Sequence, residues 1–242
     1  MSTNTNMTFL DHVGELRKRI IRIAIAVLLA MGVSLLFTPQ ILKILLLPYG
    51  SQLKVIGPTE GISNYLRIAL TTGAILALPY IFLQLWKFVA PGLLPRERRF
   101  VYVLLPCALA LFVTAASSAW FVMIPSAIRF LANFSLDIFK TEWTSQNYIP
   151  FVTALLFWIG LCFEMPLVVF LLAKLRVVNA RLLLRAWRYA ITLICVIAAV
   201  ITPTVDPFNM MLVALPLIGL YFLSIFLAVF AQKQRPASAA KN

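Results

Sequence analysis

The chain has 242 residues, of which 62% are hydrophobic and only 12% are charged, and its mean hydropathy is +0.95. An ordinary soluble domain carries about a quarter charged residues. So few charges cannot form a polar surface around a core of this size. The composition therefore excludes a soluble globular domain and predicts an integral membrane protein that is covered mainly by lipid.

The net charge of +13 is compatible with two classes of protein, one that binds nucleic acid and one whose cations follow membrane topology. The Lys and Arg residues lie between apolar runs and form no basic domain interleaved with aromatic residues. We therefore expect membrane topology to explain the charge, and we expect no nucleic-acid partner.

Six long apolar runs follow one another along the chain, and most are long enough to cross a hydrocarbon core of about 30 Å as a helix. They are Ile20 to Phe37, Ile68 to Trp86, Phe100 to Ile128, Tyr148 to Ala173, Trp187 to Ile201, and Phe208 to Ala231. We expect an all-α membrane protein in which residues 1–232 form a single six-helix domain and residues 233–242 form a short polar tail. No small-residue cleavage site follows the first run, so we expect it to be retained as a span.

The fifth run is the shortest. From Tyr189 to Pro203 there are 15 residues, which span only about 22 Å in a helix. We expect a locally thinned bilayer or shielding by neighbouring helices, and a tight hairpin between the fifth and sixth helices.

The basic residues are distributed unequally between the two sides. With six spans, the side that holds both termini collects 16 of the 21 Lys and Arg residues, and the other side holds five. The positive-inside rule then predicts that both termini lie in the cytoplasm. The two longest outer linkers contain apolar stretches, and "ILKILLLP" is typical of an interfacial helix that ends at Pro48. We therefore expect a structured outer cap.

Three acidic residues lie in different sequence surroundings. Glu15 is placed to form an i,i+4 ion pair with Arg19, and Glu97 lies among arginines in "PRERR", where a solvated loop charge is expected. Glu164 lies near the middle of the fourth run beside Pro166, where an ionisable side chain is costly and a bend is expected. Glu164 is therefore a candidate functional residue, with a buried hydrogen-bonding role as the alternative.

Enzymatic chemistry has little support in the sequence. His12 is the only histidine, the three cysteines lie within apolar runs without a CxxC pair, and no Gly-rich phosphate loop is present. We expect no metal, no cofactor, no catalytic residue and no enzyme activity.

Four segments together resemble the TatC family of the twin-arginine protein translocase. They are "FLDHVGELRKR", "LPYIFLQLWKFVAPGLLPRERR", "FEMP" and "ITPTVDPFNMMLVALPL", and they run in order from Phe9 to Pro216. The resemblance implies a concave, glove-like bundle of six helices in the bacterial cytoplasmic membrane. It also implies a receptor for the twin-arginine signal peptides of folded proteins, with TatA-type and TatB-type single-span partners, other copies of itself, and transport driven by the proton-motive force.

The same resemblance implies roles for individual residues. Signal-peptide binding would fall to Glu15, Arg17, Phe88 and Glu97, the membrane groove to Glu164, partner-helix contact to Thr202 and Met210, and the outer cap to Pro48. Two positions depart from the family pattern: Phe222 follows Tyr221 where many members have Glu, and Met210 stands where a polar residue is expected. Contacts with a partner helix at this place are then expected to be mainly packing.

The alternative function is a small-solute or proton-coupled transporter that uses Glu164 as its relay. Such transporters commonly contain internal repeats and several polar groups at the membrane midplane. The two halves of this sequence show no repeat, so the sequence favours the translocase receptor.

Overall fold

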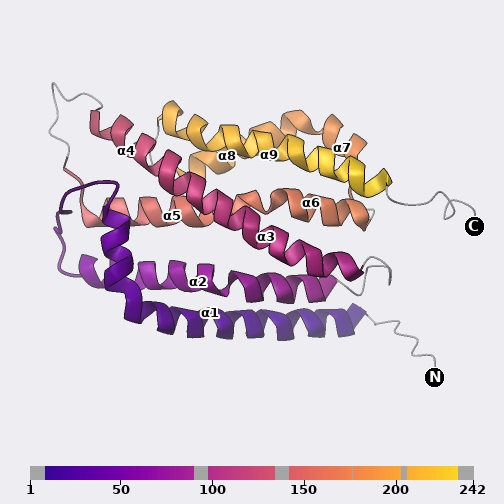
Figure 1. Cartoon of the computed structure of the whole chain (residues 1–242), viewed down its shortest axis with the longest axis horizontal. Coiled ribbons are helices and arrows are strands. Elements are labelled where there is room, and N and C mark those ends of the chain that lie inside the picture. Colours follow the sequence, from indigo (N-terminus) through magenta and orange to yellow (C-terminus); the bar gives the residue numbers. More distant parts are fainter. Residues whose placement is uncertain (1–8, 90–97, 134–141, 176, 203–205, 234–242) are drawn as a thin grey trace, which may run out of the picture. The chain divides into compact units, whose positions relative to one another are not determined.

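The computed structural model describes residues 9–89, 98–133, 142–175, 177–202 and 206–233, and the regular structure in these residues is helical (Figure 1). The elements are α1 (Phe9–Leu46), α2 (Glu60–Val89), α3 (Arg98–Ser118), the π-helix η2 (Ala119–Met123), α4 (Ile124–Asn133), α5 (Ser145–Phe163), α6 (Met165–Lys174), α7 (Ala180–Arg185), α8 (Trp187–Ile201) and α9 (Pro207–Lys233).

The helices confirm the six predicted spans. Five stretches are long and apolar enough to cross a membrane: Val13–Leu46, Glu60–Phe88, Leu104–Asn133, Ser145–Lys174 and Pro207–Gln232. The sixth is α8, which has 15 residues and is shorter than the others, as its sequence predicts. The short helix α7 was not predicted.

The expected break after the first span is wrong. The helix α1 does not stop at Pro39 but continues to Leu46, so "ILKILLL" extends the first helix and is not a separate interfacial one. A proline removes a single backbone donor, and beside it the Thr38 hydroxyl donates to the Ser34 carbonyl at 2.9 Å. The helix ends at Leu46, and Gly50 in the following turn has a φ of +75°, which favours a residue without a Cβ.

Two of the spans contain an interruption close to a proline. In the third span, the Ile124 N–H donates to the Ala119 carbonyl five residues earlier, which makes a π-turn just before Pro125. In the fourth span, α5 ends at Phe163 and α6 begins at Met165, so Glu164 stands alone between them. The predicted bend at Pro166 is thus present as a helix break.

The chain's contacts group into two compact units, residues 1–41 with 65–109, and residues 42–64 with 110–242. In the first unit α1 and α2 run side by side (Figure 1). They approach closely at Gly73, where an added Cβ would lie 2.6 Å from the backbone of Met31. Gly73 therefore permits backbone contact that a larger residue would prevent.

The second unit is organised around α9, which packs against α5, α6, α7 and α8. Small side chains line one end of this packing: Ala173, Ala180, Ala228 and Ala231 form a buried cluster. Since lipid is as apolar as leucine, close van der Waals contact between small residues is what stabilises such helix pairs in a membrane.

In the second unit the described parts of the two long linkers contact each other, and their role as an outer cap stays a prediction. The Lys54 N–H donates to the Trp143 carbonyl at 3.1 Å, and the Ser145 N–H donates to the Lys54 carbonyl at 2.8 Å. The rings of Tyr49, Trp143 and Tyr148 pack together beside this pairing. We call these five residues the linker cluster.

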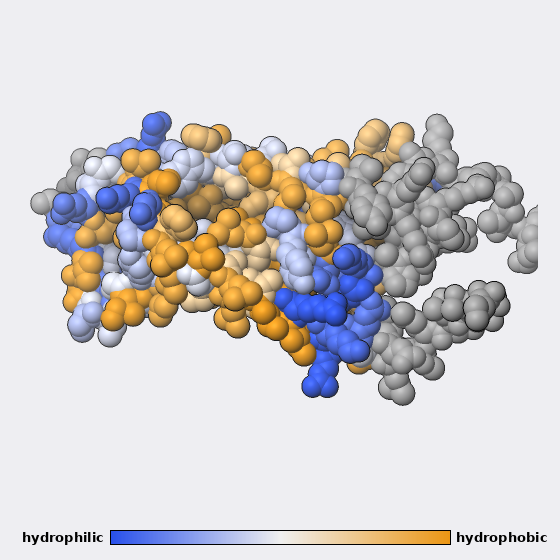
Figure 2. All heavy atoms as spheres, turned by 60° about the horizontal axis from the view of Figure 1, so that its bottom comes forward, coloured by the Kyte–Doolittle hydropathy of each residue, from blue (hydrophilic) through white to orange (hydrophobic). Residues whose placement is uncertain are grey.

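Large apolar side chains face outward along the helices. On α1 the side chains of Leu29 and Leu36 are 69% and 75% exposed, and on α8 that of Val200 is 79% exposed. Figure 2 shows an apolar surface along most of α1, with hydrophilic side chains where the helix begins. A surface of this kind is stable in contact with lipid and not with water.

Candidate functional site

Glu15 and Arg19 form an ion pair one turn apart at the start of α1. The Arg19 Nε donates to Glu15 Oε1 at 3.0 Å, and a second guanidinium nitrogen, Nη2, pairs with the same oxygen. The side chain of Glu15 is 23% exposed and that of Arg19 is 13% exposed. The predicted i,i+4 pair is therefore confirmed.

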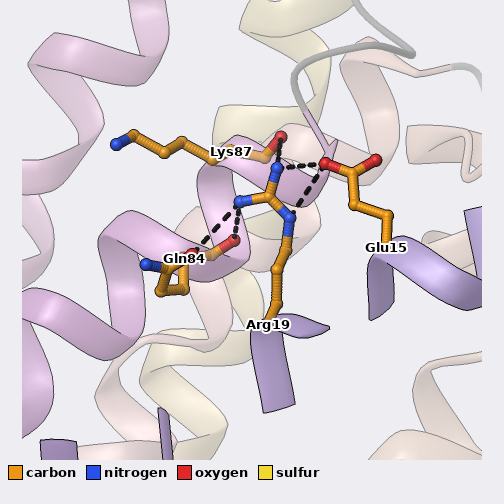
Figure 3. Close-up of polar contacts among 4 residues, drawn as sticks. All are labelled: Glu15, Arg19, Gln84 and Lys87. Atoms are coloured by element: carbon orange, nitrogen blue, oxygen red, sulfur yellow. Dashed lines mark hydrogen bonds and ion pairs between the residues drawn. The ribbon is translucent and has the colours of Figure 1, made fainter. Parts of the chain in front are cut away.

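The same guanidinium also reaches the end of α2 (Figure 3). Arg19 Nη1 donates to the Gln84 carbonyl at 3.3 Å and to Gln84 Oε1 at 3.2 Å, and Nη2 donates to the Lys87 carbonyl at 3.2 Å. The last turn of a helix has carbonyls without helical partners, and cations are favoured there. Arg19 therefore caps α2 while it pairs with Glu15.

The sequence did not predict the role of Arg19 and Gln84 as a bridge between two helices. Gln84 is 5% exposed although it is polar. One signal was available, because a glutamine inside the apolar segment "IFLQLW" needs a buried partner. The identity of that partner depends on how α1 and α2 pack, which the sequence does not state.

The Glu15 side chain is only partly buried. Its second oxygen, Oε2, is buried and has no hydrogen-bond partner in the part of the chain that the structure describes. Arg17 is exposed on the same turn, and Phe88 is half-buried near the end of α2. Glu97 lies outside the described residues. The structure thus brings Glu15 to the end of α2, and the peptide-binding role of these residues stays a prediction.

Glu164 is buried, with 5% of its surface exposed. Its Oε1 lacks a hydrogen-bond partner among the described residues. The backbone at this point is irregular, since Pro166 has no N–H to offer to Cys162. A carboxyl group at a helix break inside a span matches the expectation for Glu164, and its role in a groove stays a prediction.

Thr202 follows the last residue of α8, and Met210 lies in the first turn of α9. The Thr202 hydroxyl donates to the Ala198 carbonyl at 2.8 Å, and its side chain is buried. Asp206 caps α9, because its Oδ2 accepts the Asn209 N–H at 2.7 Å. Met210 follows in the first turn of α9 and is partly exposed. Contact of either residue with a partner helix stays a prediction.

The beginning of α9 also borders an open groove of about 480 Å³. The groove is lined by Ser126, Arg129, Phe130, Asn133 and Phe208. The rings of Phe130 and Phe208 stack with their centroids 4.5 Å apart and their planes at 18°. This contact between α4 and α9 was not predicted.

Phe222, the second departure from the family pattern, follows Tyr221 on α9. Tyr221 is buried and its hydroxyl donates to the Leu183 carbonyl at 2.6 Å, which ties α9 to α7. Phe222 is 48% exposed. An apolar residue at this outward position fits lipid or a partner helix and requires no polar contact.

Pro48 lies in the turn that follows α1, next to Tyr49 of the linker cluster. Glu60 was not among the predicted residues, yet it holds this region together. Its Oε2 accepts the Ser145 hydroxyl at 2.8 Å and its Oε1 accepts the Gly57 N–H at 2.8 Å. Its position three residues after Gly57 at a helix start was the available signal.

No group of three or more His, Cys, Asp or Glu side chains within the described ranges could hold a metal ion. The described residues include a carboxylate that binds a guanidinium beside a helix end. Together with the apolar helices, these features define a polytopic membrane protein.

The comparisons with known proteins identify the family. Residues 11–216 match the family described as "Sec-independent protein translocase protein (TatC)". The chain is 39% identical over 227 residues to the TatC of Carboxydothermus hydrogenoformans, a match that covers 93% of each chain. It is 35% identical over 250 residues to the TatC of Koribacter versatilis, covering 98% of this chain and 92% of that one. The chain belongs to the TatC family and is a subunit of the twin-arginine translocase.

A solved structure agrees with this assignment. A crystal structure described as the twin-arginine translocase receptor TatC superposes on this chain with a TM-score of 0.83 and 34% sequence identity. The match covers 91% of this chain and 99% of the other. The multi-pass helical fold is therefore that of the family.

Proposed function

We propose that this chain is the receptor subunit that binds twin-arginine signal peptides of folded proteins at its cytoplasmic face. Glu15 accepts one arginine of the peptide, Glu97 accepts the other, and Arg17 and Phe88 shape the surface around them. The solved relative is described as a twin-arginine translocase receptor, which supports the same role here.

The observation that carries this proposal is the pairing of Glu15 with Arg19. The carboxylate already accepts two N–H groups of a guanidinium in a partly buried position. Guanidinium forks match carboxylates better than the point charge of a lysine does. A site that holds the chain's own arginine has the chemistry to hold an arginine from a peptide.

The charges around the site favour selectivity. Arg17, Lys18 and Arg22 lie on the same segment of α1, so a basic peptide is repelled unless it finds the acids. Selection by a few carboxylates within a repulsive field is an efficient way to separate one basic motif from others.

The remaining parts of the proposal concern location and partners. The uneven distribution of Lys and Arg supports a bacterial cytoplasmic membrane location with both termini inside. The exposed apolar side chains of Leu193, Val196 and Val200 on α8, close to Thr202, form a surface for single-span TatA-type or TatB-type helices. Further copies of the chain complete the complex, and the proton-motive force drives export.

Peptide binding to the purified protein in lipid nanodiscs tests the central claim. A labelled twin-arginine peptide is titrated into the wild type, Glu15→Gln and Glu142→Gln, the last being an exposed acid of the outer linker that serves as the control. We expect Glu15→Gln to weaken binding roughly tenfold or more, because a charge-assisted pair is lost, and Glu142→Gln to leave it unchanged.

A twin-lysine peptide completes the design. It should bind the wild type more weakly than the twin-arginine peptide, and Glu15→Gln should reduce the difference. Equal binding of both peptides by the wild type, together with no effect of Glu15→Gln, would mean that the ion pair of Glu15 is structural only and does not bind the peptide.

A second candidate function is proton-coupled transport of a small solute through Glu164. The observation in its favour is the buried Glu164 carboxyl at a break in the fourth span. Deletion of the gene separates the two functions. Loss of export of twin-arginine reporters with unchanged solute uptake favours the receptor, and the opposite result favours the transporter.

A further inference from the structure

The guanidinium of Arg19 occupies the position in which the proposed function places an arginine of the signal peptide. It uses two nitrogens on Glu15 Oε1, and the other oxygen of Glu15 is buried. The carboxylate therefore presents no free edge to an incoming peptide. A peptide arginine can pair with Glu15 only if Arg19 leaves it.

The end of α2 provides a place for Arg19 when it leaves Glu15. The carbonyls of Gln84 and Lys87 and the Gln84 side-chain oxygen already accept hydrogen bonds from Nη1 and Nη2. These three acceptors can retain the guanidinium after Glu15 is released. The exchange then replaces the Arg19 pair of Glu15 by a pair with the peptide arginine, while Arg19 keeps hydrogen bonds to three neutral oxygens.

We propose that Arg19 is an internal competitor for the peptide site, which closes Glu15 in the empty receptor and lowers the affinity for every basic peptide by the same factor. The inference rests on the proposed function, since it assumes that the peptide binds Glu15. In this arrangement Glu15 determines the preference for arginine over lysine, and Arg19 determines how tightly any peptide must bind elsewhere to open the site.

Peptide binding distinguishes a competing role of Arg19 from a role in positioning Glu15. If Arg19 only positioned Glu15, its removal would weaken binding of the twin-arginine peptide. It would also reduce the preference of the protein for that peptide over the twin-lysine peptide. If Arg19 competes with the peptide for Glu15, its removal increases the affinity for both peptides by the same factor. The pair of Arg19 with Glu15 then no longer has to be broken before either peptide binds. The ratio of the two affinities stays as in the wild type.

The experiment uses the full chain in lipid nanodiscs with Arg19→Gln and, as matched control, Arg22→Gln. The control removes one positive charge from the same helix at an exposed position. It therefore measures how much the affinity for any basic peptide rises when the surface carries one positive charge fewer. We expect Arg19→Gln to bind twin-arginine and twin-lysine peptides roughly tenfold more tightly than Arg22→Gln does.

Thermal unfolding gives a second readout. The free Arg19→Gln protein should unfold at a lower temperature than the wild type, because Glu15 is left without its partner. A saturating twin-arginine peptide should raise that temperature more in Arg19→Gln than in the wild type, since tighter binding stabilises the folded state more. If Arg19→Gln does not fold, Arg19→Lys replaces it, with a smaller gain in affinity expected for both peptides.

Weaker binding of both peptides by the Arg19 variants, or a changed ratio, would overturn the competitor role while leaving the receptor function in place. The receptor function itself fails by a different result, namely no preference of the wild type for arginine and no effect of Glu15→Gln.

Discussion

The hydroxyl of Ser145 donates to the buried carboxylate of Glu60 at 2.8 Å, and this bond joins the first turn of α5 to the first turn of α2. Residues 85 positions apart in the sequence are thereby fixed to each other. The same carboxylate accepts the Gly57 N–H, so one side chain holds both a linker and a helix start.

Replacing Glu60 should destabilise the protein more than replacing the exposed Glu142. Glu60→Ala leaves the Ser145 hydroxyl and the Gly57 N–H without their acceptor in a buried position, whereas the ion pair of Lys54 with Glu142 is largely exposed. We expect the unfolding temperature in detergent, followed by circular dichroism, to fall by several degrees for Glu60→Ala and to change little for Glu142→Ala. Equal changes would contradict the role of Glu60.

Gly73→Ala should separate α1 from α2. The new Cβ would lie 2.6 Å from the Met31 backbone, and overpacking of this kind costs about 1–3 kcal/mol. The matched control is Gly32→Ala, because Gly32 is next to Met31 and nothing lies within 4 Å of its Cβ position. The unfolding temperature should fall for Gly73→Ala and should not fall for Gly32→Ala. A Gly73→Ala protein as stable as the control would mean that the helices do not touch there.

The charge distribution predicts the topology. In a chain whose Cys107, Cys162 and Cys195 are replaced by serine or alanine, a cysteine at Ser238 should react with an impermeant thiol reagent only from the cytoplasmic side. A cysteine at Ser51, which is exposed in the first outer linker, should react only from the outside. Labelling of residue 238 from the outside would invert the six-span arrangement.

Glu164 should tolerate an amide better than an aliphatic side chain if it has a role in transport. Glu164→Gln keeps the shape and hydrogen-bonding capacity of the carboxyl group but loses its charge. It should assemble normally, and export of a twin-arginine reporter should fall more than peptide binding does. Glu164→Leu should assemble but export poorly. Full export by Glu164→Leu would mean that this residue is structural only, since apolar replacement of buried polar groups is often neutral.

The sequence predicted the six spans because apolar runs of membrane length have few other solutions. The helix α8 begins and ends at Trp187 and Ile201, as its run does. The end of the first helix was predicted wrongly, since the run was ended at Phe37 and a separate interfacial helix was expected after it. The structure continues the helix through Pro39 to Leu46, because a proline removes only one backbone donor.

The candidate site was predicted in part. The pair of Glu15 with Arg19 follows from spacing along one helix, which is local information. The contact of Arg19 with Gln84 depends on the packing of α1 against α2, and that of Glu60 with Ser145 depends on where two linkers meet. Such contacts join segments far apart in the sequence, and nothing in either segment alone specifies its partner.

The uninterrupted course of α1 has a consequence for the height of the site above the membrane. Glu15 lies five positions before Ile20, where the apolar run begins, and at about 1.5 Å per residue the two Cα atoms are about 7.5 Å apart along the helix axis. Because one continuous helix contains both residues, the carboxylate cannot move toward or away from the lipid independently of the span. If a signal peptide binds Glu15 as proposed, this fixed spacing sets the distance between the bound arginine and the start of the apolar run of α1.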